Sequence, residues 1–135
     1  MRRAHLIVGL LGVLAFLITG QVMRHHNPKM QFLSPEVHMM YVSRHIYLLG
    51  AALVNMVLGL YFPLRPPGWR RALEQLGSFL ILLSPLLLLL SFASEPELGL
   101  AGRGWRSHLG LYLLFGGVMT QFLSSIATAP AADPN

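Results

Sequence analysis

The chain has 135 residues, of which 54% are hydrophobic and 11% are charged, and its formal net charge is +5. Soluble domains carry about 25% charged residues, so this composition excludes an ordinary soluble domain, and its apolar content excludes a disordered chain. The basic residues lie singly or in pairs between apolar stretches, which argues against a nucleic-acid surface, and the absence of cysteine excludes thiolate metal centres, disulfides and thiol catalysis.

Four stretches without Asp, Glu, Lys or Arg are long enough to cross a bilayer. They lie at 4–23, 45–62, 75–94 and 107–126. A hydrocarbon core of about 30 Å needs about 20 helical residues, and a backbone in lipid must satisfy its own hydrogen bonds. Short connections favour antiparallel neighbours. The sequence therefore predicts an all-α fold, a four-helix transmembrane bundle of up-down-up-down topology, as a single membrane domain over 1–135.

The first stretch follows Arg2 and Arg3, which is also how a cleaved signal peptide begins. Ile18-Thr19-Gly20 is a poor cleavage site, so a retained anchor helix is the favoured interpretation. The first helix usually sets the orientation of a membrane protein, and basic residues favour the cytoplasmic side. Here Arg2 and Arg3 lie before the first apolar stretch. Both chain termini are therefore expected in the cytoplasm, although the basic residues divide evenly between the two sides.

Proline marks the connections between the stretches, at Asn27-Pro28, Pro66-Pro67-Gly68 and Glu95-Pro96. With these boundaries the carboxylates, including Glu74 and Glu95, fall at the ends of spans or in connections. Proton-coupled carriers usually need an intramembrane carboxylate or a histidine relay. The sequence therefore argues against a proton-coupled carrier.

The second span has the most distinctive sequence of the four. It reads SRHIYLLGAALVNMVLGLY from Ser43 to Tyr61, and Ser94-Glu95-Pro96 follows the third span. This pattern resembles small four-helix bacterial inner-membrane proteins that are described only as uncharacterised. The resemblance implies a bacterial inner membrane, and it carries neither an activity nor site residues.

Three polar side chains are expected inside the bundle, namely Asn55, Ser84 and Gln121. Pro85 has no N–H to donate to the carbonyl of Ile81, which leaves that acceptor free. The Asn55 amide could donate to this carbonyl or to Ser84, as an interhelical hydrogen bond that stabilises the bundle. The alternative is that Asn55 and Gln121 line a path for a substrate or an ion.

Histidine and methionine are enriched in the first connection and at the start of the second helix. Imidazole and thioether ligands together suit copper. A metal site would draw on His25, His26, His38 and Met39, although no spacing among them is a recognised ligand motif. The competing interpretation is that these residues pack at the membrane interface.

His45 and His108 begin the second and fourth spans on the same side of the membrane. Both rings are expected to face the bundle, because a polar ring exposed to lipid tails loses its hydrogen bonds. Facing histidines could ligate haem b or contact a quinone headgroup. Arg44 is then expected to turn toward the lipid headgroups or Glu36.

The sequence contains no GxSxG nucleophile elbow, phosphate-binding loop or HExxH motif. We therefore expect a non-enzymatic membrane protein, a structural, assembly or interaction subunit. Its partners would be the lipid bilayer and other membrane subunits or further copies of the chain. The alternative function is a copper or haem b binding membrane protein that uses the outer histidines and methionines.

Overall fold

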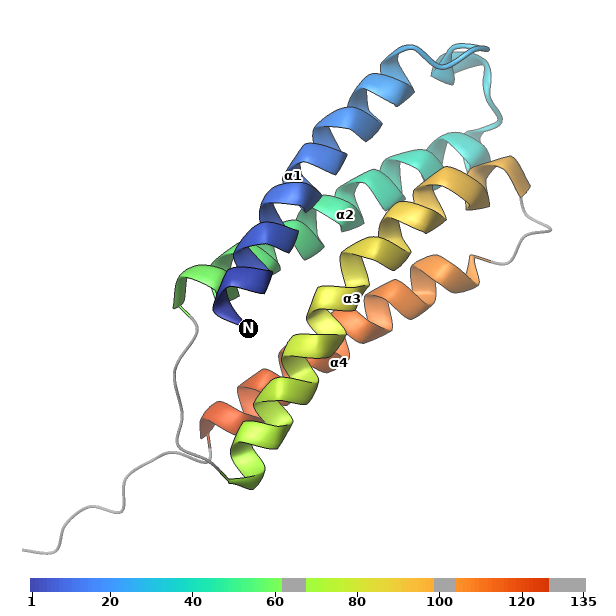
Figure 1. The fold of residues 1–135 in the computed structure, drawn as a ribbon. Coiled ribbons are helices and arrows are strands. Elements are labelled where there is room, and N and C mark those ends of the chain that lie inside the picture. Colours follow the sequence, from blue (N-terminus) through green and yellow to red (C-terminus); the bar gives the residue numbers. More distant parts are fainter. Residues whose placement is uncertain (62–67, 99–103, 127–135) are drawn as a thin grey trace, which may run out of the picture.

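A computed structural model describes residues 1–61, 68–98 and 104–126 (Figure 1). Within these ranges the chain forms four α-helices and a short 3-10 helix, and no strand. The helices are α1 (Arg2–Arg24), α2 (Pro35–Tyr61), α3 (Trp69–Leu98) and α4 (Trp105–Ile126), with the 3-10 helix η1 (Met30–Phe32) between α1 and α2. The prediction of an all-α four-helix bundle is confirmed.

Each α-helix is long and apolar enough to cross a membrane. In α3 the candidate span is Trp69–Pro96. All four helices are longer than the predicted spans, and α2 and α3 differ from them most. α2 begins at Pro35, ten residues before the predicted span, because proline is well tolerated in the first turn of a helix. The predicted break at Glu95-Pro96 is wrong, since α3 continues to Leu98 with Pro85 and Pro96 inside it. Charged residues limit an apolar stretch, but they do not end a helix.

The helices form two hairpins. α1 packs along α2, α3 packs along α4, and the hairpins meet mainly where α2 faces α3. Arg2 contacts Gly59 whereas Thr19 contacts His45, as expected for antiparallel neighbours. α1 and α4 lie at opposite edges and make little contact with each other (Figure 1). The arrangement is therefore more open than a closed square of four helices.

Small residues bring the two helices of each hairpin close together. A Cβ atom on Gly12 of α1 would lie 2.7 Å from Ala52 Cβ of α2. A Cβ atom on Gly117 of α4 would lie 2.8 Å from the carbonyl oxygen of Gly77 and 2.6 Å from Ile81 Cγ1, both on α3. These separations are shorter than van der Waals contact, so the packing requires glycine at both positions.

A small aliphatic cluster fills the centre of the molecule, and large apolar side chains cover its outside. The buried cluster contains Leu48, Ala51, Ile81, Leu88 and Leu114. Many leucine and phenylalanine side chains on all four helices are more than half exposed instead. Such a surface fits a lipid environment, where apolar side chains lose nothing by facing outward.

Candidate functional site

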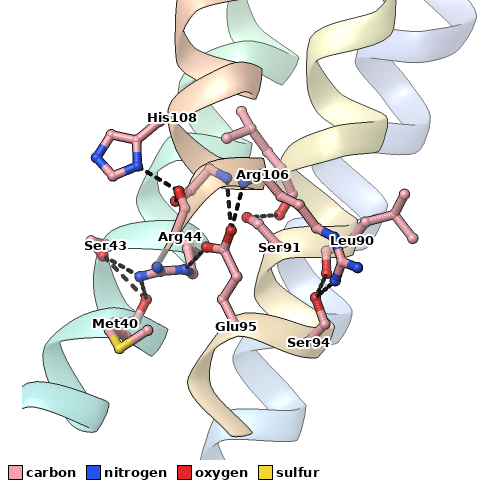
Figure 2. Close-up of polar contacts among 12 residues, drawn as sticks. Met40, Ser43, Arg44, Leu90, Ser91, Ser94, Glu95, Arg106 and His108 are labelled. Atoms are coloured by element: carbon pink, nitrogen blue, oxygen red, sulfur yellow. Dashed lines mark hydrogen bonds and ion pairs between the residues drawn. The ribbon is translucent and has the colours of Figure 1, made fainter. Parts of the chain in front are cut away.

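An ion pair between α2 and α3 lies buried at one end of the bundle (Figure 2). Arg44 Nε donates to Glu95 Oε2 at 2.7 Å, and the two side chains are 8% and 2% exposed. The other carboxylate oxygen, Glu95 Oε1, accepts the backbone N–H groups of Arg106 at 2.8 Å and Ser107 at 3.0 Å. One carboxylate therefore links three helices. We call these four residues the Arg44–Glu95 network.

The electrostatics of this network favour a charged Glu95. Its carboxylate lies at the N-terminus of α4, where unpaired N–H groups and the helix dipole attract negative charge. Arg44 Nη1 also donates to the carbonyl of Met40 at 3.1 Å. The chain crosses directly over the pair, because a Cβ atom on Gly104 would lie 2.8 Å from Arg44 Nη2. The network thus fixes both the ion pair and the start of α4.

Sequence reasoning missed this network. Arg44 was expected to turn toward the headgroups or Glu36, and this is wrong because its partner is Glu95. Glu74 and Glu95, which the sequence places at the ends of the third span, lie within α3 and are buried. The missed signal is a seven-residue spacing. Residues seven apart lie on the same face of a helix, and on α3 this face is buried. Its residues are Glu74, Ile81, Leu88 and Glu95.

A second polar cluster joins α1, α2 and α3. Asn55 Nδ2 donates to the carbonyl of Ile81 at 3.2 Å, so the predicted contact with the acceptor freed by Pro85 is present. His5 Nδ1 donates to Asn55 Oδ1 at 2.8 Å, with both residues fully buried. Ser84 is equally buried, but its hydroxyl has no hydrogen-bond partner among the described residues. Sequence reasoning did not identify His5, because a single histidine in an apolar helix shows no periodic pattern.

Gln121 joins α4 to α3. Its Nε2 atom donates to the carbonyl of Glu74 and to Ser78 Oγ, both at 2.8 Å. Gln121 also borders a 360 Å³ cavity between α2, α3 and α4, whose other lining residues are aliphatic. Because both hydrogens of its amide nitrogen are directed to α3, this contact favours the structural interpretation of Gln121 over a transport path.

His45 and His108 do not face a common point. The His45 ring stacks on Phe16 with centroids 4.0 Å apart, and its Nδ1 lies 2.9 Å from Thr19 Oγ1, both on α1. His108 is exposed, and its Nδ1 donates to the carbonyl of Gly104 at 2.5 Å. The expectation that both rings face the bundle is wrong for His108. Ser107 takes the inward position on α4, which turns His108 away by about 100°. The haem and quinone assignments remain predictions without support from this geometry.

The proposed copper ligands have separate surroundings. His25 Nδ1 lies 3.0 Å from the carbonyl of Gln21, and His26 Nε2 lies 3.3 Å from the Tyr41 hydroxyl. His38 is exposed, and Met39 is 68% exposed. In the part of the chain that the structure describes, no three His, Asp or Glu side chains are placed to hold a metal ion. α2 is helical from Pro35, which directs Tyr41 inward and leaves His38 and Met39 outside.

Comparison of the chain with protein-family models finds no match, and neither the curated proteins nor the solved structures that were compared match it. The resemblance to small inner-membrane proteins therefore remains an expectation. The functional argument rests on the residues of this chain alone.

Replacing Asn55 with leucine is expected to lower the free energy of unfolding by about 0.6–2 kcal/mol, the range of interhelical hydrogen bonds in membranes. The substitution removes the hydrogen bonds from Asn55 to the Ile81 carbonyl and from the His5 ring to Asn55. Unfolding in detergent, followed by circular dichroism, measures the loss. Val57→Leu, at an exposed position of α2, serves as the control and should change little. Equal stability of the two variants would contradict a stabilising role for Asn55.

Proposed function

We propose that the chain is a non-enzymatic membrane subunit that stabilises or assembles a complex by contacting other membrane subunits within the bilayer. The observation that carries the proposal is where the buried polar side chains are directed. Arg44, Asn55, Glu95 and Gln121 bind other helices of the same chain. They therefore act on the fold, and the function is left to the outer surface.

The two cavities between the helices support the same conclusion. Acid–base or nucleophilic chemistry needs polar groups that converge on a pocket. The 340 Å³ groove between α1 and α3 is lined by nine apolar residues, and the 360 Å³ cavity between α2 and α4 has Gln121 as its one polar lining residue among those described. Neither lining offers a nucleophile or a general base to a substrate.

The outer face of α4 offers a place for a partner helix. Transmembrane helices associate where small residues, spaced four apart, let two backbones approach. Gly110 and Gly117 of α4 already contact α3, whereas a Cβ atom on Gly116 would meet nothing within 4 Å. Thr120 lies one turn further, at the edge of the contact with Gly77 of α3. Its hydroxyl donates to the Gly116 carbonyl at 2.7 Å, so its polar atom is satisfied within the helix. This face can therefore accept an apolar helix without burying an unpaired group.

The proposal places the protein in a bacterial inner membrane with both termini in the cytoplasm. The resemblance of the second span supports the compartment. The orientation is supported by Arg2 and Arg3, which begin α1 and precede its apolar stretch, since basic flanks favour the cytoplasmic side.

Gly116→Leu is expected to separate the protein from its complex, because a leucine side chain would hold the partner helix away. The measurement is the apparent size of the protein in membranes solubilised with a mild detergent. Gly50→Leu is the matched control, because a Cβ atom there also meets nothing within 4 Å and Gly50 lies on α2. Wild type and Gly50→Leu should migrate in a larger complex, and Gly116→Leu should migrate alone. Wild type migrating alone, or a complex that Gly116→Leu leaves intact, would contradict the proposal.

A further inference from the structure

A groove runs along the molecule between α1 and α3. Both helices pack on α2 but contact each other little, and the space between them measures 340 Å³. Its walls come from α1 and α3, and its floor is Leu48 of α2. The lining consists of Val8, Leu11, Gly12, Ala15, Leu48, Leu82, Pro85, Leu86 and Leu89. We propose that an acyl chain of a membrane lipid occupies this α1–α3 groove.

The chemistry of the lining identifies the part of the lipid that binds. All nine described lining residues are apolar, so the groove offers no side-chain donor or acceptor. Pro85 in the wall leaves the carbonyl of Ile81 without its helical donor, but Asn55 Nδ2 binds that oxygen at 3.2 Å. A headgroup placed here would lose its hydrogen bonds, whereas a hydrocarbon chain would lose nothing.

The depth of the groove leads to the same conclusion. The lining runs from Val8 to Ala15 on α1 and from Leu82 to Leu89 on α3, about 10 Å along each helix axis. Both segments lie in the middle of their membrane-spanning helices. At that depth the surrounding lipid presents its chains and not its headgroups.

The rim of the groove discriminates between a lipid chain and a partner helix. Leu11 and Leu86 stand at the rim and are 59% and 55% exposed. A helix about 10 Å wide needs small residues on the opposing surface to approach closely. Gly12 is already in contact with α2, where its Cβ would lie 2.7 Å from Ala52 Cβ. A flexible acyl chain can occupy the groove without the close backbone approach that a partner helix would need.

Photo-crosslinking tests the proposal on the full-length protein in phosphatidylcholine vesicles. The probe is phosphatidylcholine with a diazirine near the end of one acyl chain, and adducts are mapped by mass spectrometry. Leu10 and Leu14 of α1 provide the comparison, because they are exposed, lie at the same depth and do not line the groove. Leu82 and Leu89 line the groove and are less exposed than Leu10 and Leu14. We nevertheless expect about threefold more adduct on Leu82 and Leu89. The preference is modest because packing alone holds the acyl chain in the groove.

Two variants make the test specific. Ala15→Phe should fill the groove and lower labelling of Leu82 to the level of Leu14, whereas Leu14→Phe, on the lipid-facing side, should leave it unchanged. Leu86→Trp narrows the rim and replaces Ala15→Phe if that variant does not fold. Phosphatidylglycerol carrying the same chain should give the same pattern, because the lining contacts no headgroup. Labelling that simply follows exposure would overturn the proposal, and so would a protein–protein crosslink at the rim.

Discussion

Replacing Glu95 with alanine is expected to lower the free energy of unfolding by about 3–5 kcal/mol, the usual effect of removing one partner of a buried ion pair. Arg44 would remain buried with an uncompensated charge, because its Nε atom loses the carboxylate at 2.7 Å. The N–H groups of Arg106 and Ser107 would lose their acceptor as well. Unfolding of the purified protein in detergent, followed by tryptophan fluorescence and circular dichroism, measures the loss.

Glu36→Ala is the control for this variant. Glu36 is an exposed carboxylate in the first turn of α2, so removing it should change stability by no more than about 0.5 kcal/mol. Glu95→Gln should be intermediate, since an amide oxygen still accepts a hydrogen bond but carries no charge. If Glu95→Ala and Glu36→Ala were equally stable, the Arg44–Glu95 network would not hold the helices together.

Gly117→Ala is expected to destabilise the bundle by about 1–3 kcal/mol, the range for overpacking. The added Cβ atom would lie 2.8 Å from the carbonyl oxygen of Gly77 and 2.6 Å from Ile81 Cγ1. The Ile81 side chain can adjust its conformation, but the Gly77 carbonyl is backbone and moves only with α3. Thermal unfolding of the detergent-solubilised variant measures the effect.

The neighbouring glycine gives a matched control. A Cβ atom on Gly116 meets nothing within 4 Å, so Gly116→Ala adds no contact and gains up to about 1 kcal/mol of helix propensity. Gly116→Ala should therefore raise the free energy of unfolding, whereas Gly117→Ala should lower it. Two equal responses would show that α3 and α4 are not packed as closely as the structure has them.

The elements of the fold follow from the sequence more readily than their ends. Uncharged stretches of about 20 residues predict four helices, because a bilayer requires helical backbone over that length. They do not predict the ends, since Pro35 and Glu95 can both lie in a helix. They also do not predict which helices pack together. That depends on close contacts such as Gly12 on Ala52, which the composition of a single helix does not reveal.

The candidate site was predictable where a proline in one helix leaves a backbone carbonyl without its helical hydrogen-bond donor. Pro85 frees an acceptor at Ile81, and Asn55 is the donor that meets it. The Arg44–Glu95 network was not predicted, because Arg44 and Glu95 are 51 residues apart and charged residues mark the ends of the predicted spans. His108 was misplaced for a similar reason. Its side of the membrane follows from the sequence, but its direction depends on which face of α4 meets α3.

The central claim is that the buried ion pair between Arg44 and Glu95 joins the helices of the bundle. A double-mutant cycle with Arg44→Met, Glu95→Gln and the double variant tests it most directly, with unfolding in detergent as the measurement. Residues in direct contact show coupling energies of about 0.5–3 kcal/mol, and we expect a value in the upper half of that range. The double variant should therefore be more stable than the sum of the two single losses predicts. Losses that simply add would show that Arg44 and Glu95 act independently and would contradict the account.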